Sequence, residues 1–334
     1  MNSEELWRVL EVECKGKEGE TIARDASPAS LSSVLLALES PARNRILFVE
    51  IPFETTHPLQ AKTRGLTITS VRFGNPQKRW LKFVCNDPQF NHIFSKFSDE
   101  IIEMAERVNP NALVQELELI IKEILVFFSE ERTAVLSLKE QQGLFAELHF
   151  LREHILPYYD GAFLTAVKSW MGPLGAIHDF HFGNRLSVEV KSYSTNNEKR
   201  LINISRPEQL ETLESSCLLL YAEGVVTSSS SGKSLSVAIE EIENILKKES
   251  IDAFYCFRER VTKCGYSVIL RDEYDSFHFT ITDESLFEVM SGFPRIQRGN
   301  LSKAIENVKY SLDIGQCSSF STEVETLYKM LRGC

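Results

Sequence analysis

The sequence predicts a mixed α/β protein built from three consecutive parts. Short stretches of β-branched and aromatic residues, separated by Pro, Gly and Asn, alternate with segments whose apolar residues recur every three or four positions. The 334 residues, 43% hydrophobic and 25% charged, are enough to bury at least one sizeable core. We expect residues 1–130 to form a β-rich N-terminal domain that ends in helices. Residues 138–232 should form a central α/β core, and residues 233–334 a C-terminal α/β extension.

The N-terminal part is expected to consist of short strands and turns up to about residue 95. The clearest strands are 43–51 and 66–73, where β-branched and aromatic residues lie between turn residues. From 97 to 129 the apolar pattern becomes helical, and Pro110 divides it into two helices.

The central part begins with a predicted helix near Gln141. Apolar residues at 144, 145, 148, 151 and 155 share one helix face, and Pro157 ends the pattern. Strands are then expected at 178–182, 186–193 and 200–205, followed by a helix at 207–213 and a strand at 217–226.

The C-terminal part is expected to begin with a helix after a short serine-rich loop. This helix covers about 235–248. Strands are predicted at 253–257, 267–270 and 307–314, and a last helix at 321–331.

Composition and charge exclude several classes of protein. No apolar run approaches the roughly 18 residues that a membrane span needs, and acidic residues stand near the N-terminus where a secretory signal has basic ones. The seven cysteines are scattered and contain no Cys-x-x-Cys pair, which argues against a disulfide framework or a cysteine zinc site and favours a reducing cytoplasm. A net charge of −10 excludes a protein that attracts nucleic acid with its whole surface, but not a local DNA site.

The segment from His178 to Lys191 carries the most informative group of polar residues. In the predicted strand 186–193, Glu189 and Lys191 project to the same side, because side chains alternate between faces. If residues 183–185 form a three-residue hairpin loop, Asp179 lies opposite Glu189, with Cβ atoms about 4.5–5.5 Å apart. A two-residue loop would put the two carboxylates on opposite faces.

Two facing carboxylates repel each other, and a divalent cation removes that conflict. Mg²⁺ prefers hard oxygen ligands and is often held by one or two carboxylates together with water and phosphate oxygens. With the ammonium of Lys191 beside them, these groups suit metal-assisted hydrolysis of a phosphodiester.

A Glu-x-Lys pair alone is common on the solvated face of a strand. Glu13-Cys14-Lys15 has the same spacing but no preceding aspartate, and we interpret it as structural. What distinguishes residues 179–191 is their setting: helix, strand, strand with Glu-x-Lys, strand, helix and strand is the order of elements in the restriction-endonuclease-like core.

The sequence resembles a family of bacterial proteins called PD-(D/E)XK motif proteins. The resemblance rests on Gly143-Leu-Phe-Ala-Glu147-Leu, Trp170-Met-Gly-Pro173, His178-Asp179-Phe, Glu189-Val-Lys191 and Ile204-Ser-Arg-Pro-Glu-Gln209-Leu, and further on Gly292-Phe-Pro-Arg-Ile and Asn307-Val-Lys-Tyr-Ser-Leu. It therefore covers most of the chain. One departure is His178, which stands where the motif has proline.

The resemblance implies a nuclease fold and assigns roles to its site residues. Asp179 and Glu189 would bind Mg²⁺, with Mn²⁺ as a substitute, and Glu147 would reach the metal from the first helix. Lys191 would assist the attacking water, and Gln209 would be an accessory catalytic residue. Related proteins resemble components of phage-defence and DNA-modification gene clusters, which implies DNA as the substrate.

The expected function is a Mg²⁺-dependent DNA endonuclease of a bacterial restriction or phage-defence system. Residues 143–210 contain seven Lys/Arg and seven Asp/Glu, so partner proteins of a defence complex could supply much of the affinity for DNA. The candidate DNA contacts lie on strand-end loops and are Arg185, Lys199, Arg200 and Arg206. A homodimer would provide two sites for the two strands of a duplex.

Two alternative functions use the same residues. The fold can serve as a catalytically silent DNA-binding or assembly subunit, and an RNA nuclease would use the same metal chemistry. The run Ser228-Ser-Ser-Ser-Gly-Lys233-Ser234 is no phosphate-binding loop, because Thr227 stands where such a loop needs its first glycine.

Overall fold

The computed structural model describes residues 2–333 apart from 17, 29, 42, 56–59, 76, 130–134, 196–197 and 213–215. The chain forms two compact units, one comprising Met1–Ala134 and Ser267–Leu270, the other Val135–Tyr266 and Arg271–Cys334. Within the described residues no helix has both the length and the apolar character required to cross a bilayer.

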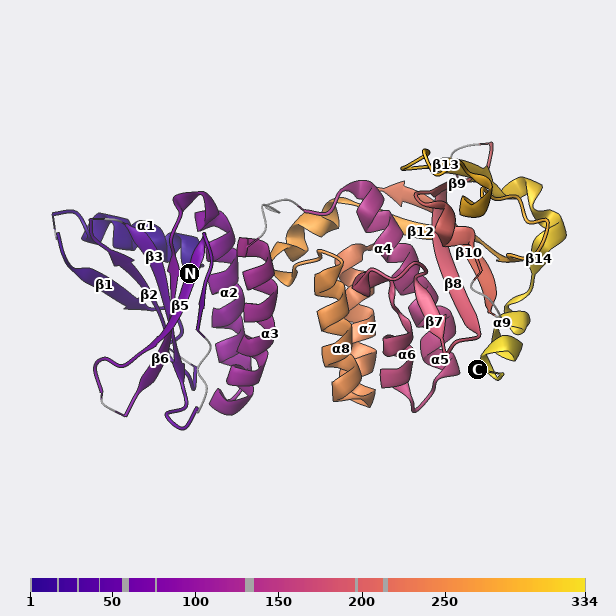
Figure 1. The fold of residues 1–334 in the computed structure, drawn as a ribbon. Helices are drawn as coiled ribbons and strands as arrows, with labels where there is room; N and C mark the ends of the chain where they lie inside the picture. The colour runs from indigo at the N-terminus through magenta and orange to yellow at the C-terminus, as the bar shows by residue number, and fades with distance from the viewer. Residues whose placement is uncertain are drawn as a thin grey trace. The chain divides into compact units, whose positions relative to one another are not determined.

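The first unit is an antiparallel sheet with helices packed on one face (Figure 1). Its strand order is β1-β2-β3-β6-β5-β4. Phe83 of β6 contacts Phe97 of α2, which marks the face that the helices cover. The elements are α1 (Ser3–Glu13), β1 (Thr21–Asp25), β2 (Val34–Glu39), β3 (Asn44–Ile51), β4 (Ala61–Lys62), β5 (Leu66–Val71), β6 (Arg79–Cys85), α2 (Asn91–Arg107) and α3 (Pro110–Ser129).

The unit begins with a helix, where the sequence predicted only strands and turns. Asn2 and Glu5 form a capping box at the start of α1. Trp7 and Leu10 are fully buried, so one face of α1 belongs to the core. The Glu13-Cys14-Lys15 triplet lies at the end of this helix and not on a strand.

The second unit is built around a mixed five-stranded sheet of order β11-β12-β10-β8-β7, with β14 added to β12. β8 and β10 are parallel, and the other pairs are antiparallel. The strands are β7 (Phe180–Phe182), β8 (Leu186–Ser194), β10 (Cys217–Ser228), β11 (Lys233–Ser234), β12 (His278–Glu288) and β14 (Ser321–Thr322).

Both faces of this sheet are covered. The helices α4, α6, α7 and α8 gather on one side (Figure 1). On the other face an apolar cluster joins Leu220 of β10 to Ile202 and Ile314. The covering elements are α4 (Leu138–Phe150), α5 (Leu156–Tyr158), α6 (Phe163–Ser169), β9 (Leu201–Ile204), α7 (Leu235–Glu249), α8 (Ile251–Lys263), β13 (Tyr310–Asp313) and α9 (Val324–Leu331).

The second unit does not divide at residue 233, where the sequence analysis placed the start of a separate extension. β12 pairs with β10 from Leu219↔Glu288 to Ser228↔His278, so residues from both sides of that boundary form one sheet. Strand pairing between segments so distant in the chain leaves no local pattern in the sequence.

Several predicted elements are wrong. The predicted strand 253–257 is part of α8, and residues 268–270 of the predicted strand 267–270 begin a 3₁₀ segment, Val268–Ser276. The predicted strand 200–205 forms β9, but β9 pairs with β13 outside the central sheet. The expected helix at 207–213 is a 3₁₀ turn over Pro207–Leu210, and residue 213 lies outside the described residues.

Arg45 connects the first helix of the chain to the sheet and to α2. Its guanidinium donates to Glu4 at 2.8 Å and to Ser95 at 2.6 Å, and it lies 5.3 Å from the centre of the Trp7 ring. The hydrogen bond from Arg45 holds the pKa of Glu4 at about 2. Docking of α1 therefore depends on one buried cation.

We expect Arg45→Met to weaken the docking of α1 by about 1–2 kcal/mol, because Ser95 and Glu4 lose their shared donor. Hydrogen exchange of α1 and α2 peptides in the full-length protein measures the loss. The matched control is Arg64→Met, whose arginine side chain is 69% exposed beside Asp87 and should change exchange little.

The same network sets a pH dependence. The Glu4 pKa is lowered on folding, so its stabilising contribution is complete above the usual carboxyl value of 4.5 and is lost as the pH falls towards about 2. The exchange difference between wild type and Arg45→Met should therefore shrink on acidification through this range. A difference that stays constant from pH 6 to pH 3 would contradict the assignment.

Candidate active site

The hairpin of β7 and β8 places Asp179 beside Glu189. Phe180 pairs with Val188 and Phe182 with Leu186, so residues 183–185 form the loop and the register continues to Asp179 opposite Glu189. The three-residue loop considered in the sequence analysis is thus confirmed. An Asp179 carboxylate oxygen also accepts a hydrogen bond from the Val190 N–H at 2.8 Å, which fixes the side chain against β8.

The Glu189 carboxylate is fully buried and receives its donors from two directions. Lys191, on the same face of β8, forms an ion pair with Oε1. Gln209 Nε2 donates to the same oxygen at 2.7 Å. The other oxygen, Oε2, is buried and has no hydrogen-bond partner among the described residues.

Gln209 is oriented by the turn that carries it. Its Oε1 accepts hydrogen bonds from the N–H of Ser205 at 3.0 Å and from the Ser205 hydroxyl at 2.9 Å. Pro207 begins the 3₁₀ turn and fixes its first backbone angle. The turn therefore aims the amide nitrogen of Gln209 at Glu189.

Glu147 reaches the same region from α4. Its Oε2 accepts a hydrogen bond from the indole N–H of Trp170 at 2.7 Å. A Cβ added to Gly172 would lie 3.1 Å from both Glu147 Oε2 and Asp179 Oδ1, so the two carboxylates border one small space that glycine leaves open.

Burial and mutual repulsion make these acids reluctant to ionise. Burial, with the charge of Asp179, raises the pKa of Glu189 to about 8 and lifts the pKa of Glu147 well above its usual range. Burial also raises the pKa of Asp179, although Lys191 and the Val190 N–H oppose it. For Lys191, burial favours a lower pKa, but attraction to Glu189 and Asp179 outweighs it and the pKa is raised.

A hard divalent cation fits the pair Asp179 and Glu189. The unpartnered Glu189 Oε2 and the space beside Gly172 leave oxygen atoms free for a ligand, and carboxylate oxygens are the donors that Mg²⁺ prefers. The described residues nevertheless contain no group of three or more His, Cys, Asp or Glu placed to hold a metal ion. Glu147 thus borders Asp179 without completing a three-carboxylate cluster.

The four expected DNA contacts lie in different surroundings. Arg206 is exposed, and its positive charge opposes the rise in the pKa of Glu189 that burial causes. Arg185 donates to the carbonyl of Gly333 at 2.7 Å, and Arg200 lies 3.1 Å from Asp283. Lys199 is exposed in the segment before β9. Of these four described residues, Arg206 is the one with a stated electrostatic effect on Glu189.

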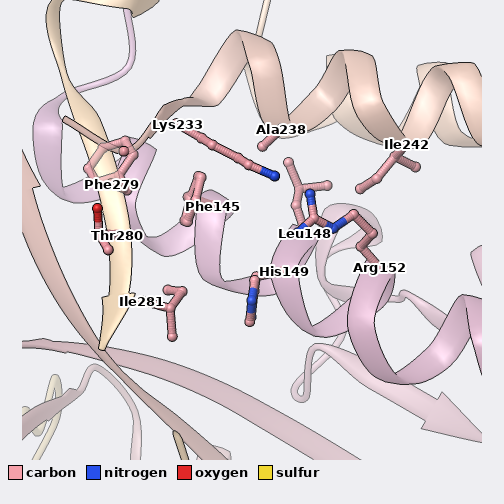
Figure 2. A pocket seen from close by; sticks show the side chains of 11 residues that line it. Phe145, Leu148, His149, Arg152, Lys233, Ala238, Ile242, Phe279, Thr280 and Ile281 are labelled. Carbon is pink, nitrogen blue, oxygen red and sulfur yellow. The ribbon is translucent and has the colours of Figure 1, made fainter. Parts of the chain in front are cut away.

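A cavity of about 270 Å³ lies elsewhere in the second unit, between α4, α7 and β12 (Figure 2). Phe145, Leu148 and Phe279 give it mostly apolar walls. Its Lys233 is 2.7 Å from Glu241, which also pairs with Arg152. None of the candidate active-site residues lines this cavity.

The sequence analysis assigned no role to three residues: Trp170 and Gly172, which it quoted only for the family resemblance, and Glu223. Nothing in the sequence indicates the hydrogen bond of Trp170 or the space at Gly172. Glu223 is a fully buried acid on β10, and His149 Nδ1 lies 2.6 Å from its carboxylate. An acid within the otherwise apolar run 217–226 is a signal that could have found it.

This arrangement defines the class to which the fold belongs. Within a mixed sheet, Asp179 precedes one hairpin strand and Glu189-Val-Lys191 lies on the next, which is the restriction-endonuclease-like arrangement. The chain belongs to the family described as "Putative PD-(D/E)XK family member (DUF4420)", whose model matches residues 3–315. No curated protein and no solved structure shows significant similarity to the chain.

We expect Gln209→Leu to destabilise the second unit by about 1–3 kcal/mol, because a buried carboxylate loses a donor. Hydrogen exchange of peptides from β8 and β10, measured over a urea series in the full-length protein, gives the effect on the second unit. Gln142→Leu is the matched control, because Gln142 donates from a half-buried site to the Ser192 hydroxyl at 3.1 Å. Equal losses in both variants would contradict the special role of Gln209.

Proposed function

We propose that this protein is a Mg²⁺-dependent DNA endonuclease that acts within a bacterial restriction or phage-defence system. The observation that carries the proposal is the pairing of Asp179 with a buried Glu189 whose second oxygen has no partner among the described residues. Family membership supports a nuclease-like fold. DNA, partner proteins and a homodimer are part of the proposal.

Asp179 and Glu189 would hold the divalent cation, with Glu147 as a neighbouring carboxylate. The cation, when bound, lowers the pKa of its water and offsets charge on the phosphate. Mg²⁺ commonly needs only one or two carboxylates beside water and substrate phosphate, so a three-carboxylate cluster is not required. Mn²⁺ is expected to substitute.

The protein groups around the carboxylates would orient the substrate and the attacking water. Lys191 is held by Glu189, so its ammonium stays at the site and can contact a phosphate or a water. Gln209 fixes the Glu189 oxygen to which Lys191 is bound. Arg206, exposed near Glu189, is suited to a phosphate of the DNA backbone.

A catalytically silent DNA-binding or assembly subunit is the second candidate. The balanced charge of residues 143–210 and the acidic charge of the whole chain favour it, because neither attracts DNA to a cleavage site. The presence of Lys191 beside the two carboxylates favours the enzyme, because a silent copy has no chemical need for that complete set.

Cleavage of supercoiled plasmid separates the two candidates. We expect nicking with Mg²⁺ or Mn²⁺ and none with EDTA, and a loss of about 100-fold or more in Asp179→Ala and in Lys191→Ala. Lys15→Ala is the matched control, because Lys15 follows Glu13 with the same spacing outside the site.

Retained cleavage by a clean Asp179→Ala preparation would refute the site. Cleavage by no variant, with or without candidate partner proteins, would favour the silent subunit. Parallel reactions on single-stranded DNA, duplex DNA and RNA would identify the substrate.

The cation site predicts a separate effect at Gly172. We expect Gly172→Ala to weaken Mn²⁺ binding by about tenfold, because the added methyl would press on Asp179 and Glu147 from 3.1 Å. Calorimetric titration with Mn²⁺ measures the affinity. Gly143→Ala is the control, since nothing lies within 4 Å of its added Cβ. Unchanged affinity in Gly172→Ala would place the cation elsewhere.

A further inference from the structure

The face of the first sheet opposite its helices is unusually apolar. On the covered side, the helices contribute Trp7 of α1 and Phe94 and Phe97 of α2, whose rings contact one another. On the opposite face an apolar cluster contains Ala37, Ile46, Phe48 and Trp80, with Leu35, Val71 and Val84 packed against it. The four residues of this cluster are themselves buried, so they form a second small core of the unit, and the surface lies over it.

Aromatic rings reach the surface on this face. Phe73 stacks on Trp80, with ring centres 5.0 Å apart and planes within 16°, and meets the edge of Phe48 at 4.9 Å. Phe73 is nevertheless 41% exposed. One side of its ring is therefore supported by Trp80, while the ring remains accessible. Phe53, 45% exposed, has Arg72 over its ring at 5.1 Å.

The same region is basic in an otherwise acidic chain. Between Glu54 and Asp87 the sequence contains no acidic residue, although the whole chain has a net charge of −10. The basic residues of this segment are Lys62, Arg64, Arg72, Lys78, Arg79 and Lys82. By the strand register, Lys78 and Lys82 share the face of Trp80, whereas Arg79 points to the other face. We call the surface formed by Phe73, Lys78 and Lys82, with the Arg72–Phe53 pair, the basic aromatic face.

Cations and rings are interleaved on this face. The ammonium of Lys82 lies 6.0 Å from the Phe48 ring, and that of Lys78 lies 5.7 Å from the Trp80 ring. One acid lies on the same face: Glu50 is directly opposite Trp80 in the register and pairs with Lys78 at 2.7 Å. Arg72 stacks on Phe53 and is itself exposed.

We propose that the basic aromatic face binds single-stranded nucleic acid. Interleaved cations and accessible aromatic rings are what such a strand requires, because its phosphates need positive charge and its unpaired bases need planar surfaces. The exposed ring of Phe73 would stack on a base, with Arg72 and Lys82 on neighbouring phosphates. This inference rests on the proposed nuclease function, but concerns binding and needs no cleavage.

Binding of a labelled single strand tests the proposal in the full-length protein. Fluorescence anisotropy with a dye-labelled 20-nucleotide DNA, in EDTA, excludes hydrolysis and any metal contribution. We expect Phe73→Leu to lower the affinity by about tenfold, because leucine keeps the apolar cover of Trp80 but offers no ring for stacking. A double variant, Arg72→Gln with Lys82→Gln, should reduce the salt dependence by about 1.4 logarithmic units per unit of log salt.

Matched controls separate this face from charge in general. Lys96→Gln with Lys122→Gln removes two charges from α2 and α3 and should leave binding unchanged. Asp179→Ala should bind the strand as the wild type does. If Asp179→Ala loses cleavage but keeps binding, the two proposals are supported by separate measurements. If the protein binds the strand but never cleaves, the binding proposal stands and the nuclease proposal fails.

Three results would overturn the proposal. One is equal binding by wild type, Phe73→Leu and the Arg72/Lys82 double variant. Another is no binding of the strand, as DNA or as RNA, by the wild type at low salt. The third is a dimer, measured by light scattering without nucleic acid, that Phe73→Leu dissociates, because the face would then be a contact between copies of the chain.

Discussion

Burial of the Glu189 carboxylate is the constraint on which the arrangement of the second unit depends. The side chain is 0% exposed in the middle of β8, where an ion without partners would be strongly unfavourable. Lys191 and Gln209 both serve Oε1, whereas Oε2 has no hydrogen-bond partner among the described residues. A buried carboxylate with hydrogen bonds to only one of its two oxygens contributes little to the stability of a fold. It is well suited to keeping one oxygen available for a ligand.

Asp179 links the segments around this carboxylate. Its side chain accepts from the Val190 N–H, and its carbonyl accepts from the N–H groups of Met171 at 2.7 Å and Gly172 at 3.0 Å. The hairpin, the turn at Gly172 and β8 are therefore held together at the point where the acids meet. The backbone register keeps Asp179 and Glu189 opposite each other, so they repel each other whenever both are ionised. A bound cation would relieve this repulsion directly.

Local patterns in the sequence predicted the residues at the centre of the site. The features that were not predicted depend on contacts between segments far apart in the chain. Glu189 and Lys191 follow from strand alternation, and Asp179 from the length of one loop. Glu147 and Gln209 came from resemblance, since α4 and the turn at Pro207 meet β8 only in the folded chain. The partition at 233 failed because β12 returns to β10 after two helices. Residues 253–257 are aromatic and suggest a strand, but Ser250 caps a helix whose Phe254, Phe257 and Val261 are buried on one side.

The charges around the candidate site give it little electrostatic attraction for a polyanion such as DNA. Its acids repel phosphate until a cation binds, and two of the four expected DNA contacts, Arg185 and Arg200, are engaged with Gly333 and Asp283. Lys191 is committed to Glu189. The same carboxylates would therefore serve catalysis and oppose binding, because side chains that would hold a cation also repel the phosphates of a substrate. A basic surface on the first unit, as proposed for the basic aromatic face, would resolve this conflict, since it would attract a strand without changing the charge at Glu189.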